Sequence, residues 1–251
     1  MLDPILIAIA FVFMLAGFVK GVIGMGLPTI VIGLLATSMP PAHAIAIVIV
    51  PAILTNLWQT FGGPYFFRIV RRLWPLLLCC CLGVWSGIGF LSGSFAPYGT
   101  ILLGVLLIVY SIVSLRRPQF HVAKEKEGWI GATCGYLSGL IAAATGVQVI
   151  PAMPFIHALG MEREEFIQAL GVFFTTSTVA MLFNLTHGGF LTREVALPSA
   201  LGLVAALIGM YLGQVLRQRM PPETFRRWFL ISMIALGAYL AIDKIVQLHL
   251  L

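Results

Sequence analysis

A lysine stands among glycines in the stretch GFVKGVIGMGLPTI, residues 17–30, within an otherwise apolar N-terminal region. Glycine lets the backbone approach a ligand closely, and proline is tolerated at the first position of a helix. Gly24, Gly26 and Pro28 therefore predict a break in the chain, after which a short helix begins. The start of such a helix presents unpaired N–H groups and roughly half a positive charge. Together with the ammonium of Lys20, the pattern predicts a site for an anion.

A second stretch of the same kind, AAATGVQVIP, covers residues 142–151. Pro151 corresponds to Pro28 and lies near the start of another short apolar piece. The position that corresponds to Lys20 is Ser138, so only one of the two stretches carries a charge. Two such helix starts that face each other inside the protein would bind an anion between them.

Two further groups of polar residues lie in apolar runs. Thr55, Asn56 and Gln59 cluster beyond a kink expected at Pro51. The second group has the i, i+3, i+7, i+10 spacing of one helix face and consists of Gln168, Gly171, Thr175 and Thr178. One interpretation is a vestibule that leads to the anion. The other is hydrogen bonding between helices, which such side chains commonly supply, and the sequence leaves both open.

The composition is that of a membrane protein. Of the 251 residues, 60% are hydrophobic and 10% are charged, whereas a soluble domain carries about 25% charged residues. The predicted fold class is therefore an all-α polytopic membrane protein. The net charge of +6 comes from basic residues scattered between apolar runs. This pattern is typical of topology signals and lipid contact, and nucleic acid is not an expected partner.

Runs of about 20 apolar residues predict eight membrane-spanning helices, because this length crosses the hydrocarbon core. They cover residues 4–22, 42–61, 73–91, 97–115, 128–146, 166–185, 195–216 and 228–247. Two shorter pieces, residues 28–38 and 149–159, reach about 16 Å each, against a core of about 30 Å. Each piece is expected to be a half-helix whose start lies inside the membrane.

Glycine pairs recur in the same order in two halves of the chain. Gly17-x-x-x-Gly21 recurs as Gly135-x-x-x-Gly139, Gly62-Gly63 as Gly188-Gly189, and Gly83-x-x-x-Gly87 as Gly209-x-x-x-Gly213. These pairings predict a duplication, with a half-helix as the second of five segments in each repeat. The predicted divisions are a first repeat at 1–115, a cytoplasmic linker at 116–127 and a second repeat at 128–251. Because five is an odd number, the second repeat is expected to be inverted.

Basic residues fall on one side of this ten-segment arrangement. Twelve of the fifteen follow odd-numbered segments, namely Arg68, Arg71, Arg72, Arg116, Arg117, Lys124, Lys126, Arg163, Arg217, Arg219, Arg226 and Arg227. Cytoplasmic loops carry the excess of Lys and Arg. These loops are therefore expected in the cytoplasm and both termini in the periplasm.

Lys20 also has a purely structural interpretation. It lies near the cytoplasmic end of the first predicted segment, from which a lysine side chain can snorkel to the membrane interface. The half-helix that follows is too short to cross, so the turn before it is expected inside the membrane. That placement favours the anion-facing role, with snorkelling as the alternative.

No acidic residue lies well inside a predicted long span. Cation pumps and most proton carriers place a carboxylate there, so the pattern favours anions. His43, His157 and His187 fall at segment ends, where an interfacial role is commoner than a proton relay. The four cysteines match no metal spacing, and no catalytic cluster stands out. Neither a metal, a cofactor nor an enzymatic activity is expected.

Two stretches, AGFVKGVIGMGLPTIVIGLL and GYLSGLIAAATGVQVIPAMPFIHALGMEREEFIQALGVFFTTST, resemble the TauE/SafE sulfite exporter family, also called TSUP. The resemblance covers nearly the whole chain and implies a secondary transporter of sulfite, sulfonates and other small sulfur or carboxylate anions. By position, the implied binding region falls on Gly24, Gly26, Pro28, Thr145, Gly146 and Pro151. Members often keep a glycine-rich turn in both halves, whereas three alanines precede Thr145 here, and Gln148 would supply donors instead.

The predicted function is transport of a small anion across the bacterial inner membrane, in the direction of export, by movement of one repeat against the other. The alternatives are a passive anion channel and a membrane-embedded enzyme or assembly subunit. The expected partners are the anion and the lipid bilayer, while a coupling proton or other ion and a homodimer remain open. The predicted substrate-binding residues are Lys20, Gly24, Gly26, Pro28, Thr29, Asn56, Gln59, Thr145, Gly146, Gln148, Pro151, Gln168 and Thr175.

Overall fold

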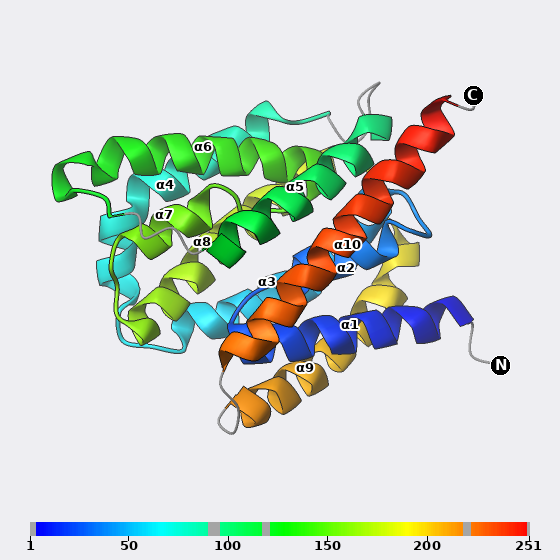
Figure 1. Cartoon of the computed structure of the whole chain (residues 1–251), viewed down its shortest axis with the longest axis horizontal. Helices are drawn as coiled ribbons and strands as arrows, with labels where there is room; N and C mark the ends of the chain where they lie inside the picture. Colours follow the sequence, from blue (N-terminus) through cyan, green and yellow to red (C-terminus); the bar gives the residue numbers. More distant parts are fainter. Residues whose placement is uncertain (1–3, 90–95, 117–120, 218–221, 250–251) are drawn as a thin grey trace.

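A computed structural model describes residues 4–89, 96–116, 121–217 and 222–249 (Figure 1). Its α-helices are α1 (Pro4–Ile23), α2 (Leu27–Leu35), α3 (Pro41–Phe61), α4 (Phe66–Ser86), α5 (Ala96–Arg116), α6 (Glu127–Thr145), α7 (Ala152–Ala158), α8 (Arg163–His187), α9 (Ala196–Arg217) and α10 (Pro222–His249). Two short 3-10 helices, η1 (Lys124–Lys126) and η2 (Arg193–Val195), precede α6 and α9. The described residues contain no β-strand, and the predicted all-α class is confirmed. Positions 90–91 of the predicted span 73–91, Arg117 and Arg219 lie outside the described residues.

Six helices in the described part of the chain are long and apolar enough to cross a membrane, judged by length and composition. They are Pro4–Ile23, Pro41–Phe61, Tyr98–Arg116, Arg163–His187, Arg193–Leu216 and Arg227–Gln247. They correspond to six of the eight long spans predicted, and the chain is a multi-pass membrane protein. The two others, α4 and α6, are not among the six. The first seven residues of α4 include three arginines, and α6 carries glycine, serine and threonine along its length.

The two half-helices are present and shorter than expected. α2 has nine residues and α7 has seven, so they extend about 13 Å and about 10 Å. Gly26 precedes α2 with a φ of 104°, a left-handed conformation that glycine adopts without strain. Pro151 is the N-cap of α7 rather than its first residue, and Gly160, with a φ of 64°, follows shortly after its end. Neither helix can cross a hydrocarbon core of about 30 Å.

Glycines bring helices into backbone contact, among them α1 with α9 and α4 with α6. A Cβ atom on Gly17 or Gly21 of α1 would lie 2.2 or 2.3 Å from a carbonyl oxygen of α9. One on Gly209 of α9 would lie 2.1 Å from a carbonyl oxygen of α1. α6 meets α4 in the same way, since a Cβ on Gly135 or Gly139 would lie 2.1 Å from a carbonyl oxygen of α4. The recurring G-x-x-x-G pairs therefore mark close helix contacts, a common use of small residues in membranes.

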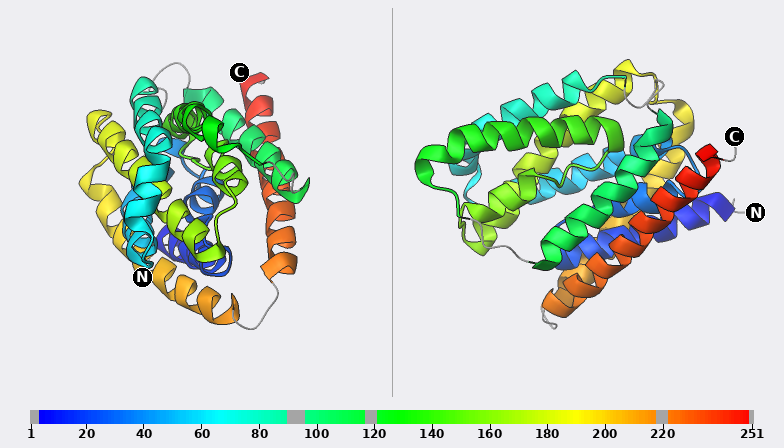
Figure 2. Two further views of the ribbon diagram at one scale, coloured as in Figure 1. Left: turned by 90° about the vertical axis from the view of Figure 1, so that its left-hand side faces the viewer. Right: turned by 45° about the horizontal axis from the view of Figure 1, so that its top comes forward.

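The helices of the two halves pair in a reciprocal scheme. α1 packs on α9 and α4 on α6, so the first helix of each half meets the fourth helix of the other. α3 packs on α8, and α5 packs on α10. Later residues of α1 contact later residues of α9, since Gly17 meets Ala206 and Gly21 meets Met210, so these helices run parallel. α3 and α8 run antiparallel, because Asn56 contacts Thr178 whereas Gly63 contacts Gln168. α1 begins and α10 ends at the same end of the bundle (Figure 1 and Figure 2).

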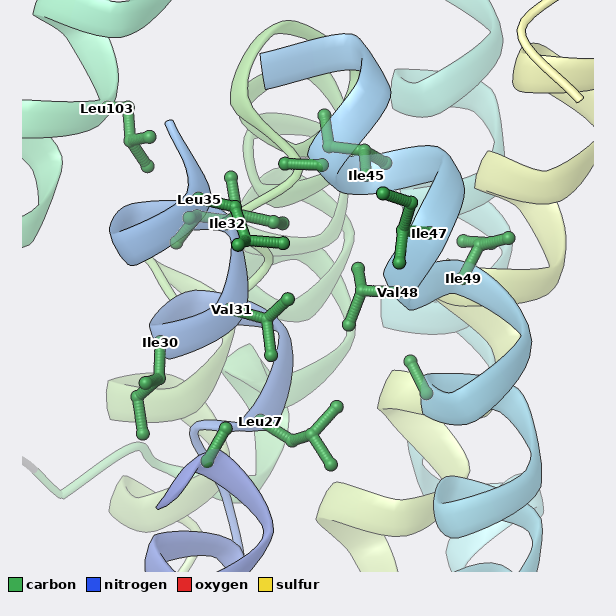
Figure 3. Packing of buried hydrophobic residues seen from close by; sticks show 14 of the residues in the cluster. Leu27, Ile30, Val31, Ile32, Leu35, Ile45, Ile47, Val48, Ile49 and Leu103 are labelled. Atoms are coloured by element: carbon green, nitrogen blue, oxygen red, sulfur yellow. The ribbon is translucent and has the colours of Figure 1, made fainter. Parts of the chain in front are cut away.

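α2 lies in the middle of the bundle, against α3. Val31 and Ile32 of α2 lie between the two helices, where Ile45 and Val48 of α3 approach them (Figure 3). All four side chains are buried. Backbone that is irregular at membrane depth must be covered by protein or line a cavity. The apolar contacts of α2 meet this requirement for a helix that is too short to span.

Two ion pairs join the starts of α4, α6 and α8 at one end of the bundle. Arg72 donates to the two carboxylate oxygens of Glu127 at 2.6 and 2.9 Å and to the Leu159 carbonyl at 3.2 Å. Its hydrogen bond lowers the pKa of Glu127 below the usual value for a glutamate. Arg68 lies 3.9 Å from Glu165. The arginines of α4 thus connect the two halves at the end where the sequence predicts the cytoplasm.

Candidate anion site

Lys20 lies inside the bundle, in the last turn of α1, with an exposed fraction of 4%. Its Nζ atom donates to Thr55 Oγ1 at 3.0 Å and to Asn56 Oδ1, both on α3. The Thr55 hydroxyl itself donates to the Pro51 carbonyl at 2.8 Å, which leaves its oxygen to accept from the lysine. The side chain therefore points to α3 rather than to the surface of the bundle, where a snorkelling lysine would end.

The charge of Lys20 has no counter-ion among the described residues. The ion pairs in this part of the chain are Arg68–Glu165 and Arg72–Glu127, so no described carboxylate lies within 4.0 Å of the ammonium. An ammonium has three N–H donors, and the two neutral acceptors on α3 use two of them. Burial of an unpaired charge is costly. An anion at the third donor would satisfy both the charge and the hydrogen bond.

Gln59 holds the turn after α1 against α3 and α8. Its Nε2 atom donates to the Gly24 carbonyl at 3.1 Å and to the Ile167 carbonyl at 2.8 Å. The N–H of Gly24 donates to the Lys20 carbonyl at 2.7 Å, which places Gly24 one helical turn beyond the lysine. Lys20 and the turn at residues 24–26 therefore adjoin the same stretch of α3.

The polar face predicted on α8 meets the polar residues of α3. Asn56 Nδ2 donates to Thr178 Oγ1 at 3.3 Å, while its Oδ1 accepts from Lys20. One turn further along α3, the hydroxyl oxygens of Thr60 and Thr175 lie 2.8 Å apart. The three helices α1, α3 and α8 thus share one polar seam, defined by Lys20, Thr55, Asn56, Gln59, Thr60, Gln168, Thr175 and Thr178.

The side-chain amide of Gln168 forms its hydrogen bonds with backbone groups. Its Nε2 atom donates to the carbonyls of Thr60 and Gly63, each at 2.8 Å, and its Oε1 atom accepts from the Tyr65 N–H at 2.9 Å. These contacts are of the kind that the helix-joining interpretation describes. They tie α8 to the loop between α3 and α4.

Gly24 borders open space inside the protein. It is buried and has a φ of 89°, yet a Cβ atom built on it would meet none of the described atoms within 4 Å. The other described glycines with equally open surroundings, Gly89, Gly128, Gly160 and Gly189, are exposed. The space beside Gly24 lies one turn from Lys20 and next to Gln59, where the sequence predicts the anion.

α2 begins immediately after this turn. Gly26 is its N-cap, Pro28 lies in its first turn and Thr29 is buried. The partial positive charge of the helix is therefore directed at the turn that follows Lys20. In contrast to Gly24, Gly26 is closely surrounded, since a Cβ atom there would lie 3.6 Å from atoms of Val19 and Phe229.

At the second break, between α6 and α7, side chains of the protein form hydrogen bonds with the backbone. Ser138 Oγ, at the position that corresponds to Lys20, accepts the N–H of Ala152 at 2.9 Å, at the start of α7. The Thr145 hydroxyl donates to the Ile141 carbonyl at 2.8 Å and accepts from the Val147 N–H at 3.2 Å. Both side chains thus satisfy backbone groups near the break.

Three more residues of the predicted set surround this break. Gly146 is tightly packed, because a Cβ atom there would lie 2.6 Å from Ile45 and 2.7 Å from Ile32. Gln148 is 5% exposed, and its Oε1 atom has no hydrogen-bond partner. Pro151 caps α7. Among these residues, Gln148 alone brings an unsatisfied buried polar atom to the second break.

Tyr110 of α5 connects the two breaks and was not singled out from the sequence. Its hydroxyl lies 3.5 Å from the sulfur of Met25, at the break between α1 and α2, and 3.7 Å from the sulfur of Met153, in α7. A tyrosine in the middle of an apolar span is a polar group at membrane depth, and this was the available signal. Thr60 was also missed, although it follows Asn56 by four residues on the same helix face.

No group of three or more His, Cys, Asp or Glu side chains in the described ranges could hold a metal ion. The polar seam instead offers one cation, hydroxyls and amides, which suit an oxyanion. Lys20 is the only cation among the buried polar residues that the structure describes.

Comparison with known proteins gives one family. The family model described as Sulfite exporter TauE/SafE matches residues 9–240. The match includes Lys20, both breaks and the polar faces of α3 and α8. No curated protein and no solved structure matches the chain.

Proposed function

The chain belongs to the TauE/SafE sulfite exporter family, and on this premise we propose that it is a secondary transporter that exports a small anion. Sulfite, organosulfonates and related sulfur or carboxylate anions are the proposed substrates. The proposed location is the bacterial inner membrane, with both termini in the periplasm. The basic residues near the starts of α4, α6 and α8 support this orientation, because positive loops stay in the cytoplasm.

The observation that carries the proposal is the buried, uncompensated charge of Lys20. Its described partners, Thr55 and Asn56, are neutral acceptors. We assign the anion to the space between Lys20 and the turn at Gly24, where the start of α2 adds a partial positive charge. In this assignment Gly24 and Gly26 shape the turn that borders the anion.

The remaining predicted residues take supporting roles in the proposal. Asn56 fixes the lysine, Gln59 fixes the turn, and Gln168 and Thr175 hold α8 against α3 beside the path to the site. At the second break, the free amide oxygen of Gln148 would accept a hydrogen bond from a water in the shell of the anion or from the O–H of a protonated anion. Pro28, Thr29, Thr145, Gly146 and Pro151 shape the starts of the two half-helices.

We further propose that the two halves form an inverted repeat that alternates access by moving against each other. Three features support this arrangement: the reciprocal pairing of α1 with α9 and of α4 with α6, the antiparallel contact of α3 with α8, and the common end at which α1 begins and α10 ends. The anion site lies on α1 and α3 of the first half, against α8 of the second half.

Flux into liposomes distinguishes the carrier from a passive channel. The purified protein is reconstituted, loaded with unlabelled sulfite, and supplied with labelled sulfite outside. A carrier predicts saturation and accumulation of label by counterflow. A linear, non-saturating flux without counterflow would contradict the carrier and favour the channel.

Thermal stabilisation by ligand tests the site itself. A screen of sulfite, sulfonates, sulfate and carboxylates is performed on the wild type and on Lys20→Ala, because a ligand that binds only the folded state raises Tm. The best anion is expected to stabilise the wild type and to lose this effect in Lys20→Ala. If Lys20→Ala keeps wild-type binding of that anion, the assignment of Lys20 is wrong.

A further inference from the structure

The polar seam contains a single basic side chain. The buried polar residues of the described chain include one cation, Lys20, and one carboxylate, Glu165, which lies on α8 one turn before Gln168 and 3.9 Å from Arg68. The start of α2 adds roughly half a charge. The positive charge available to a ligand between α1, α3 and α8 is therefore less than two.

Most side-chain donors of the seam are already engaged, although Asn56 donates only one of its two amide N–H groups, to Thr178. Gln59 donates to two backbone carbonyls, and so does Gln168. The Thr55 hydroxyl donates to the Pro51 carbonyl, and the Thr60 hydroxyl donates to the Asn56 carbonyl at 2.9 Å. These groups have no N–H or O–H left with which to stabilise a second negative charge.

Charge balance then decides which anion fits. A singly charged oxyanion forms a neutral pair with the ammonium, whereas a doubly charged one leaves a net negative charge in a buried site. An uncompensated buried charge is strongly unfavourable. Binding of a dianion would require a second cation, and the described seam contains none; the N–H groups at the start of α2 add only a partial positive charge.

We infer that the site selects singly charged oxyanions, such as hydrogen sulfite and organosulfonates, and rejects dianions of the same size, such as sulfate. The inference rests on the proposed function and adds the charge state of the substrate to it. Lys20 is the specificity-determining residue, because its charge has to match that of the ligand. Sulfite would then be bound in its hydrogen sulfite form.

Methanesulfonate and sulfate provide the test, since both are tetrahedral and compact but differ by one charge. Their dissociation constants are measured calorimetrically on the full-length protein in detergent at neutral pH and equal ionic strength. Methanesulfonate is expected to bind at least about tenfold more tightly, a ratio that corresponds to about 1.4 kcal/mol. Equal affinity, or tighter binding of sulfate, would overturn the inference and leave the anion site standing. Absence of binding by either anion, and by sulfite, would overturn both.

A second cation beside Gly24 should reverse the preference. Gln59→Lys places a second ammonium on α3, one turn from Thr55 and Asn56, which contact Lys20, and Gln59→Met is the uncharged control of similar length. The affinity ratio of sulfate to methanesulfonate is expected to rise at least about tenfold in Gln59→Lys relative to Gln59→Met. An unchanged ratio in a folded Gln59→Lys protein would contradict selection by charge balance. If Gln59→Lys does not fold, the wild-type ratio alone decides.

Discussion

The two breaks of the chain share a framework and differ in chemistry. At each break a long helix ends at a glycine with positive φ near a short helix, and each long helix packs through glycines on a helix of the other half. At the first break, Lys20 turns its ammonium to the neutral acceptors of α3. At the second break, Ser138 accepts the N–H of Ala152, at the start of α7.

This difference separates structural from ligand-directed roles. The hydroxyl oxygen of Ser138 accepts a hydrogen bond inside the protein and carries no charge for a ligand. The ammonium of Lys20 has a charge that its described neighbours do not balance. We therefore propose that the first half supplies the charge of the site and that the second half has a supporting role.

Removal of the ammonium of Lys20 should have the largest effect on transport. Lys20→Met keeps the length of the side chain and removes its charge, so a bound anion would be left unpaired at a cost of about 3 kcal/mol or more. Sulfite counterflow is expected to fall by about a hundredfold. The matched variant Ser138→Ala should lose about 1 kcal/mol of stability and retain transport. Comparable loss of counterflow in both folded variants would show that the two breaks do not differ in this way.

A carboxylate introduced beside Lys20 should prevent anion binding without destabilising the fold. Asn56→Asp has nearly the same shape and places a carboxylate where Asn56 Oδ1 now accepts from Lys20. The ammonium would then be paired inside the protein, so anion-dependent stabilisation should disappear while Tm without ligand rises. Asn56→Ser serves as the uncharged control. Retained anion binding in Asn56→Asp would contradict the role of an unpaired lysine.

The shared framework predicts equal sensitivity of the two halves to a single added methyl group. A Cβ atom on Gly209 would lie 2.1 Å from the Met14 carbonyl, and one on Gly83 would lie 2.1 Å from the Tyr136 carbonyl. Gly209→Ala and Gly83→Ala should each destabilise the protein by about 1–3 kcal/mol, measured as a loss of Tm. Gly128→Ala, at an exposed glycine without close neighbours, is the control and should leave Tm unchanged. A large difference between the two buried variants would argue against equivalent packing.

The smallest effect is expected on stability, from loss of the ion pair between Arg72 and Glu127, which joins the two halves. Arg72 holds the pKa of Glu127 below the ordinary value of about 4.3. A depressed pKa stabilises the folded state above the unfolded value, and this contribution is lost as the pH falls through the folded value. Arg72→Gln should therefore lower stability by about 1 kcal/mol at pH 7, and its Tm should approach that of the wild type at strongly acidic pH. A Tm difference that does not shrink there would contradict this account.

Much of the fold could be predicted from run lengths and glycine spacing. A piece of 11 apolar residues cannot cross the membrane, so the half-helices could be located before their contacts were known. The partner of each glycine pair could not be predicted, because a G-x-x-x-G spacing indicates a close contact without saying with which helix. α4 and α6 were placed as spans from apolar runs, yet arginines in α4 and small polar residues in α6 lower their hydropathy.

The candidate site could be predicted only in part, because its residue types are visible in the sequence and its contacts are not. Residue types identified Lys20, Asn56 and Gln59, since polar groups in an apolar run require partners. That Lys20 contacts Asn56, and that Gln59 reaches Gly24, depends on where α1 lies relative to α3 in the bundle, which no local pattern encodes. Tyr110 was missed because its partners are two methionine sulfurs, which carry no distinctive sequence signal.

The central claim is that an anion binds directly to the ammonium of Lys20. Selenite is an analogue of sulfite whose selenium atom can be located by anomalous diffraction from crystals of the wild type. The account predicts selenium between Lys20 and Gly24, with an oxygen about 3 Å from Nζ. A selenium atom bound elsewhere, with Nζ still contacting only Thr55 and Asn56, would contradict it.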